Sequence, residues 1–124
     1  MTDSPLVLVV DDDEDCRASL REALEHAQFN VDDVQSGRAA LDRLLRRDAP
    51  EPSVILLDLE MPIMTGTEFI MVVESYYRLS RIPIVVVTGR EPLLAGHRFG
   101  VSAVVRKPLD PDLLARTINN LIGR

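Results

Sequence analysis

An uninterrupted apolar run that ends at a carboxylate is the feature that most constrains the fold of this chain. Residues 54–57 are all apolar, Asp58 follows directly, and the Met61-Pro62 pair cannot continue the run. A run of this kind is typical of a strand covered on both faces, as in a parallel sheet flanked by helices. In open sheets of that class, ligands bind beyond the carboxyl ends of the strands. The run therefore predicts a buried parallel strand that carries Asp58 to a ligand-binding edge.

Three more apolar runs end in polar residues in the same way. They cover residues 6–10, 82–87 and 103–105, and a shorter run of mixed polarity at residues 29–34 predicts an outer strand. Because parallel strands end at one edge of their sheet, we expect the polar residues that follow them to meet there. These residues are Asp11, Asp12, Asp58, Thr88 and Lys107.

Between the strands, apolar residues recur at three- and four-residue spacing, which predicts amphipathic helices. The predicted helices cover residues 14–28, 36–47, 67–77, 92–99 and 111–124, with Ser36 and Asp110 as caps. In the first, we expect Arg17 and Arg21 to face solvent. We place Tyr76 and Tyr77 on the buried face of the third helix, and Leu113 on that of the last.

Five strand signals alternate with five helix signals, which predicts right-handed βαβ crossovers. The expected fold is α/β, a single doubly wound five-stranded parallel sheet flanked by five helices. At 124 residues the chain is close to the commonest domain size, so residues 1–124 are expected to form one domain.

Composition narrows the range of functions. The net charge of −6 disfavours direct binding of nucleic acid or of an anionic membrane. No apolar run approaches the roughly 20 residues that span a bilayer, so we expect a cytoplasmic protein. Cys16 is the only cysteine, which excludes an internal disulfide, and its place on the apolar face of a helix predicts a packed side chain rather than a reactive thiol.

The polar groups expected at the sheet edge favour phosphoryl chemistry. Converging carboxylates repel one another unless a cation lies among them, and oxygen ligands suit a hard divalent ion such as Mg²⁺. Mg²⁺ commonly shares such a site with a phosphoryl oxygen. Lys107 could neutralise a phosphoryl charge and Thr88 could donate a hydrogen bond to it, so Asp58 is the candidate nucleophile.

Four segments of this sequence, spread over the whole chain, resemble the receiver domain of bacterial two-component response regulators. The segments are LVLVVDDDED, VILLDLEMPIMTG, IPIVVVTG and VVRKP. The resemblance implies a flavodoxin-like fold of the CheY type. It also implies that Asp58 accepts a phosphoryl group from a phosphohistidine on a sensor histidine kinase or phosphotransfer protein.

The same resemblance assigns roles to the other site residues. It implies that Asp12, Asp58 and the backbone carbonyl of Glu60 bind Mg²⁺, with Asp11 helping through water. Thr88 and Lys107 would bind the phosphoryl oxygens, and the Lys107-Pro108 peptide bond would be cis. A receiver of this kind promotes only its own phosphorylation and dephosphorylation and is not otherwise an enzyme. Family members commonly dimerise or bind target proteins through the face that here comprises residues 92–99, 103–105 and 111–124.

Three positions are expected to modulate the signal. Receivers often carry Tyr or Phe near the place of Val104, and a valine cannot move a ring between surface and interior, so we interpret Val104 as a core strand residue. Glu60 and Arg90 stand two residues after Asp58 and Thr88 and carry opposite charges. Our hypothesis is that they pair across the site and slow hydrolysis of the acyl phosphate.

Two alternatives remain at this stage. The first is a haloacid dehalogenase-type phosphatase with Asp11 as nucleophile, which leaves Asp58 without a role and lacks the threonine expected at the position of Asp15. The second is a receiver-like interaction module that is never phosphorylated. The intact set of acidic residues and Lys107 argues against the second.

Overall fold

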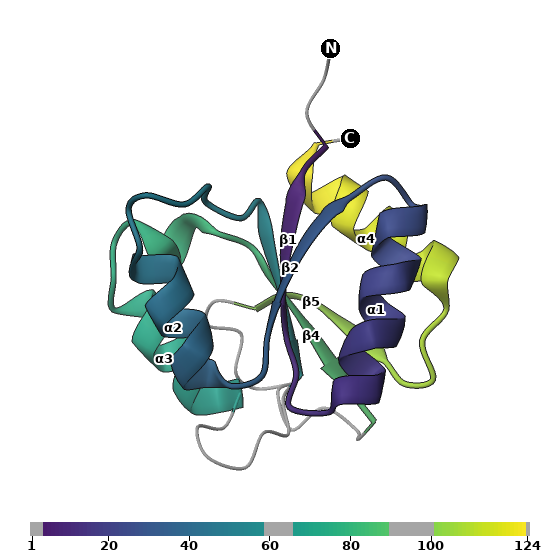
Figure 1. Ribbon diagram of the computed structural model, residues 1–124, viewed down its shortest axis with the longest axis horizontal. Helices are drawn as coiled ribbons and strands as arrows, with labels where there is room; N and C mark the ends of the chain where they lie inside the picture. The colour runs from purple at the N-terminus through teal and green to yellow at the C-terminus, as the bar shows by residue number, and fades with distance from the viewer. Residues whose placement is uncertain (1–3, 59–65, 90–100, 124) are drawn as a thin grey trace.

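A five-stranded parallel sheet with helices on both faces forms the body of the molecule (Figure 1). The computed structural model describes residues 4–58, 66–89 and 101–123. The strands are β1 (Leu6–Val10), β2 (Asn30–Val34), β3 (Val54–Asp58), β4 (Ile84–Thr88) and β5 (Val101–Arg106), in the order β2-β1-β3-β4-β5. The helices are α1 (Glu14–His26), α2 (Gly37–Leu45), α3 (Gly66–Glu74), the 3-10 turn η1 (Leu79–Arg81) and α4 (Pro111–Ile122).

This architecture confirms the predicted doubly wound α/β class. The helix predicted over residues 92–99 lies outside the described residues. Within the described part of the chain, no helix is both long enough and apolar enough to cross a bilayer.

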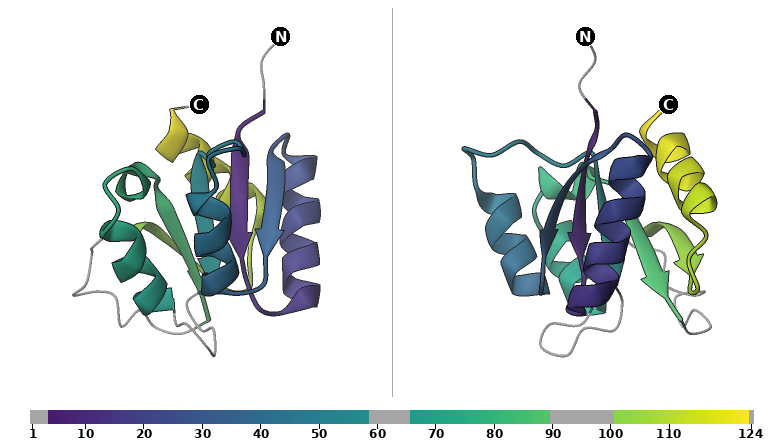
Figure 2. Two further views of the ribbon diagram at one scale, coloured as in Figure 1. Left: turned by 60° about the vertical axis from the view of Figure 1, so that its left-hand side comes forward. Right: turned by 45° about the vertical axis from the view of Figure 1, so that its right-hand side comes forward.

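The helices divide into two layers. Helices α1 and α4 cover one face of the sheet, and α2 and α3 cover the other (Figure 2). Alternate residues of β1 enter the two cores: Val7 and Val9 pack with α1 and α4, whereas Leu8 and Val10 pack with α2 and α3. The central strands are apolar without a break because each of their faces is buried.

Side chains cap three of the helices, and two of these caps, Ser36 and Asp110, are the ones that the sequence predicts. Asp13 accepts a hydrogen bond from the backbone N–H of Cys16 at the start of α1, Ser36 caps α2, and Asp110 caps α4. Helix α1 ends at His26, before the predicted residue 28, because Gln28 adopts a left-handed backbone with φ of 73°.

Helix α2 also ends earlier than expected. It stops at Leu45, so Arg46 is its C-cap and Arg47 lies beyond it. Arg46 and Arg47 therefore lie past the last helical turn, where helical periodicity no longer predicts which way a side chain points.

Four predicted core positions are wrong. Tyr76 and Tyr77 are exposed because α3 ends at Glu74 and the chain turns toward η1. Leu113, in the first turn of α4, is 46% exposed and lies beside the apolar stripe rather than within it. Val104 is 37% exposed because β5 is an edge strand, on which the neighbouring Val105 points to the opposite face and packs in the α1–α4 core.

Adjacent leucines on α4 offer a matched test of this packing. Leu114 is 1% exposed and Leu113 is 46% exposed. We expect Leu114→Ala to lower the free energy of unfolding by about 2–5 kcal/mol, because it removes buried methyl groups and leaves a cavity. Leu113→Ala should cost less than about 1 kcal/mol. Urea denaturation of both variants measures the difference, and equal losses would contradict the described orientation of α4.

Candidate functional site

The register of the sheet brings the polar strand ends together. Val10 lies opposite Leu57, and Asp58 lies opposite Val87, so the residues that follow β1 and β4 reach the same edge as the end of β3. Thr88 in turn lies opposite Arg106 at the end of β5. The strand pairing therefore brings the polar strand ends together at the carboxyl edge, as the sequence predicts.

Three carboxylates gather at this edge. One carboxylate oxygen from each of Asp11, Asp12 and Asp58 lies within 4.8 Å of the others. Asp11 and Asp58 are buried, with Asp58 6% exposed, whereas Asp12 is exposed. Two carboxylates about 4 Å apart repel by about 4 kcal/mol at an effective dielectric constant near 20. The cluster therefore requires positive charge.

Lys107 supplies part of that charge. Its Nζ lies 4.0 Å from Oδ1 of Asp58, and about a third of its side chain is exposed. The backbone N–H of Lys107 donates a hydrogen bond of 2.9 Å to the carbonyl of Thr88, which holds β5 beside β4 at this point. The Lys107-Pro108 peptide bond is cis, as the family resemblance implies. The buried Thr88 and the partly exposed Lys107 thus flank Asp58 on the side away from β1.

Asp11 has one carboxylate oxygen bonded and one available. Oδ1 accepts a 2.9 Å hydrogen bond from the backbone N–H of Asp13. Oδ2 is buried and has no hydrogen-bond partner among the described residues. Buried carboxylate oxygens are normally satisfied, so an oxygen left open beside Asp12 and Asp58 has the character of a cation ligand. The donor set is all oxygen, which fits Mg²⁺.

Cys16 lies close to this cluster. Burial, and then the neighbouring Asp11 carboxylate, raise the pKa of its thiol to about 12. The thiol is therefore protonated near neutral pH, and the side chain packs against the α1–α4 core. The prediction of a packed cysteine side chain is confirmed.

Sequence reasoning missed one residue near the site. Arg17 was expected to face solvent, yet its side chain is only 17% exposed, and its Nη1 donates a 2.9 Å hydrogen bond to the backbone carbonyl of Asp11. Helical periodicity could not show this contact. It depends on how α1 crosses the loop after β1, which only the folded chain defines.

Several sequence predictions fall on residues that the structure does not describe. Glu60 and Arg90, the proposed pair across the site, lie outside the described residues. The same holds for the 92–99 segment of the expected partner-binding face.

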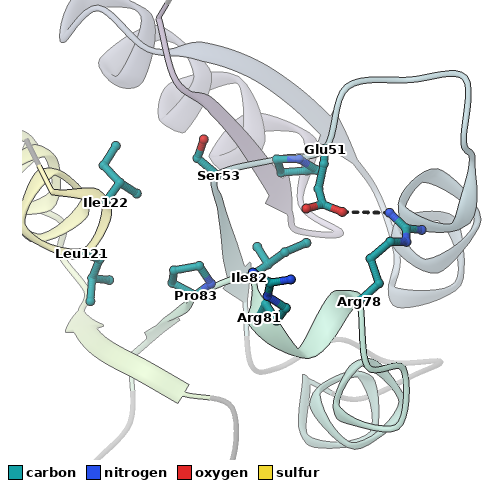
Figure 3. Close-up of a pocket in the computed structure, with 9 residues that line it drawn as sticks. Glu51, Ser53, Arg78, Arg81, Ile82, Pro83, Leu121 and Ile122 are labelled. Carbon is teal, nitrogen blue, oxygen red and sulfur yellow. Dashed lines mark hydrogen bonds and ion pairs between the residues drawn. The ribbon is translucent and has the colours of Figure 1, made fainter.

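The described residues also form a hollow at the opposite edge of the sheet (Figure 3). It measures about 540 Å³ and lies between the segments that precede β3 and β4 and the end of α4. A 2.8 Å ion pair between Arg78 and Glu51 borders it. Among the predicted site residues that the structure describes, none lines this hollow, so the acidic cluster lies apart from it.

Comparison with known proteins agrees with the geometry. The family model of the response regulator receiver domain matches residues 7–119. The two-component response regulator ORR5 of Oryza sativa subsp. japonica is 33% identical over 122 residues, covering 96% of this chain and 90% of that protein. The response regulator Rre1 of Synechocystis sp. is 30% identical over 122 residues, covering 95% of this chain and 52% of that protein.

A solved structure extends the likeness to the backbone. The chemotaxis response regulator CheY4 of Vibrio cholerae matches with a TM-score of 0.84 and 28% identity, covering 95% of this chain and 98% of that chain. Receiver domains are phosphoacceptor regulators rather than enzymes in the ordinary sense. With strand order, acidic edge, family match and relatives in agreement, this chain belongs to the receiver domain family of two-component response regulators.

Proposed function

We propose that Asp58 is the phosphoacceptor of this receiver and that residues 1–124 act as one phosphorylation-controlled domain. The observation that carries the proposal is the position of Asp58 between two groups of opposite charge. Asp11 and Asp12 lie on one side, and Lys107 Nζ stands 4.0 Å from Asp58 Oδ1 on the other. A carboxylate that is nearly buried, with a cation within reach, is well placed to carry added phosphoryl charge.

The proposed reaction is phosphoryl transfer from a phosphohistidine. A carboxylate oxygen of Asp58 attacks phosphorus, a new P–O bond forms, and the P–N bond breaks with its electron pair returning to the imidazole nitrogen. The ammonium of Lys107 pairs with one phosphoryl oxygen, and the Thr88 hydroxyl donates to another. Positioning and charge neutralisation supply most of the catalysis in reactions of this kind.

Asp11, Asp12 and Asp58 would hold Mg²⁺, together with the backbone carbonyl of Glu60, whose role rests on the family resemblance. When bound, the divalent ion supplies positive charge that offsets the carboxylates and the phosphoryl oxygens. Asp11 contributes a buried oxygen without a hydrogen-bond partner among the described residues. Asp12 is exposed and therefore lies on the open side of the cluster.

The proposed donor is a sensor histidine kinase or a phosphotransfer protein, which would place the domain in the cytoplasm. The proposed output surface comprises β5, α4 and residues 92–99, used by a target protein or by a second copy. We propose no direct binding to nucleic acid or to a membrane, since the net charge is −6. Val104 belongs to this surface. It is partly exposed, but a valine offers no ring that could report the position of Thr88.

Replacement of the proposed acceptor tests the assignment directly. With acetyl phosphate and Mg²⁺, the parent should gain one phosphoryl group in intact-mass spectrometry, and Asp58→Asn should gain none because the nucleophilic oxygen is lost. Asp42→Asn, at an exposed position on α2, is the matched control and should be labelled like the parent.

The same measurement separates the alternatives. Labelling that persists in Asp58→Asn and disappears in Asp11→Asn would support the phosphatase assignment and overturn this one. A parent that acquires no phosphoryl group from acetyl phosphate or from a phosphohistidine donor would support the interaction module that is never phosphorylated.

Mg²⁺ should stabilise the folded domain through the acidic cluster. At a concentration of about 100 times its Kd, a ligand that binds only the folded state adds about 2.7 kcal/mol to the free energy of unfolding. We expect thermal denaturation of the parent to show this gain and Asp12→Asn to lose most of it. Without Mg²⁺, Asp12→Asn should be more stable than the parent, because removing one of three like charges relieves repulsion. Equal Mg²⁺ responses in both proteins would contradict the assignment of Asp12.

The lifetime of the phosphoryl group tests the proposed pairing of Glu60 and Arg90. We propose that this pair hinders the approach of water to the acyl phosphate, so Arg90→Ala should shorten the half-life of the phosphorylated domain. The decay is followed by intact mass after removal of the donor, with Arg47→Ala as a control for the loss of a distant arginine. An unchanged half-life in Arg90→Ala would remove this part of the proposal.

A further inference from the structure

We infer that Arg17 is a positioning residue for the cation site, because it ties the backbone of Asp11 to strand β2. The inference rests on the proposed function, in which Asp11 helps to hold a divalent ion. It assigns a role to a basic residue beside a site whose side-chain ligands are all acidic.

The contacts of Arg17 connect two strands. Its Nη1 donates a 2.9 Å hydrogen bond to the backbone carbonyl of Asp11, directly after β1. Its Nε lies 3.7 Å from Oδ1 of Asp33, on the neighbouring strand β2. Since the side chain is only 17% exposed, solvent screens these contacts less than it screens an ordinary surface pair.

Arg17 completes a clamp on the main chain of Asp11. The N–H of Asp11 donates a 3.2 Å hydrogen bond to the carbonyl of Val34 in the segment of β2. Its carbonyl accepts from Arg17, which is itself held by Asp33 of the same strand. Both peptide groups of this residue are therefore anchored to β2, one directly and the other through the guanidinium.

The clamp bears on the cation because it restricts where the Asp11 side chain can point. Oδ1 is engaged by the N–H of Asp13, so the free Oδ2 has a defined direction only if the backbone of Asp11 is fixed. Mg²⁺ demands near-octahedral geometry and tolerates displaced ligands poorly. Loss of residues that orient metal ligands typically weakens metal affinity by about 10–100-fold.

Electrostatics alone predicts the opposite effect. Arg17 is a positive charge near a site for a positive ion, so a purely coulombic influence would make its removal strengthen Mg²⁺ binding. The sign of the change in affinity therefore distinguishes positioning from charge.

Arg21 provides a matched control on the same helix. It stands one turn further along α1 and donates a 2.9 Å hydrogen bond to Asp33, the residue that also faces Arg17. Its other ion pair is with Glu25, and no described contact joins it to Asp11. Arg21→Met removes the same charge and a contact to the same aspartate, but it leaves the hydrogen bond between Arg17 and the Asp11 carbonyl in place.

Each purified protein is titrated with Mg²⁺ alone, without a phosphodonor, and isothermal titration calorimetry measures the Kd. We expect Arg17→Met to raise the Kd for Mg²⁺ by roughly 10-fold or more, and Arg21→Met to change it by less than about 2-fold. Arg17→Lys keeps the charge and guards against a poorly folded Met variant. The compact ammonium of lysine cannot reproduce the fixed N–H donors of the planar guanidinium, so Arg17→Lys should also weaken Mg²⁺ binding.

A second readout separates positioning from a general loss of stability. The Mg²⁺ concentration that half-saturates phosphorylation by acetyl phosphate should rise in Arg17→Met, while the rate at saturating Mg²⁺ stays close to that of the parent. Unchanged or tighter Mg²⁺ binding in Arg17→Met or Arg17→Lys overturns the inference, as does equal weakening in Arg21→Met. Failure of the parent itself to bind Mg²⁺ would instead overturn the cation site of the proposed function.

Discussion

Repulsion among carboxylates at one edge of the sheet is the constraint on which the site depends. Asp11, Asp12 and Asp58 are brought within 4.8 Å because β1 and β3 are adjacent and in register, so their ends cannot separate without disrupting the sheet. Lys107 offsets part of this charge from the neighbouring side. The remaining negative charge makes the folded state sensitive to anything that adds or removes charge there, which is the property a phosphorylation switch needs.

The platform that holds these charges is apolar on both sides. Strands β1, β3 and β4 are buried along almost their whole length, and their side chains alternate between two separate cores. Apolar burial contributes about 25 cal/mol per Å², so such a sheet can offset a repulsion of several kcal/mol at its edge. A change of charge at the edge is thus expected to alter local geometry while the core remains intact.

Arginines organise the acidic surface next to the site. Asp32 and Asp33 on the edge strand β2 are paired with Arg43, Arg21 and Arg17, which come from the two helices that pack on either side of β2. These pairs attach the edge strand to both helical layers. They engage three of the fourteen basic residues of the chain in ion pairs within the fold.

The sequence by itself determined the fold class and the candidate site, because both follow from local patterns. Apolar runs ended by Asp58 and Thr88 identify the ends of buried strands, and parallel strands must end together. Only the tertiary structure decided which positions near the element ends are buried. Tyr77 lies past the end of its helix, Val104 is on an edge strand, and Arg17 bonds to Asp11, because each outcome depends on neighbours distant in sequence. Periodicity reports which face of an element is apolar, but it contains no information about what lies opposite that face.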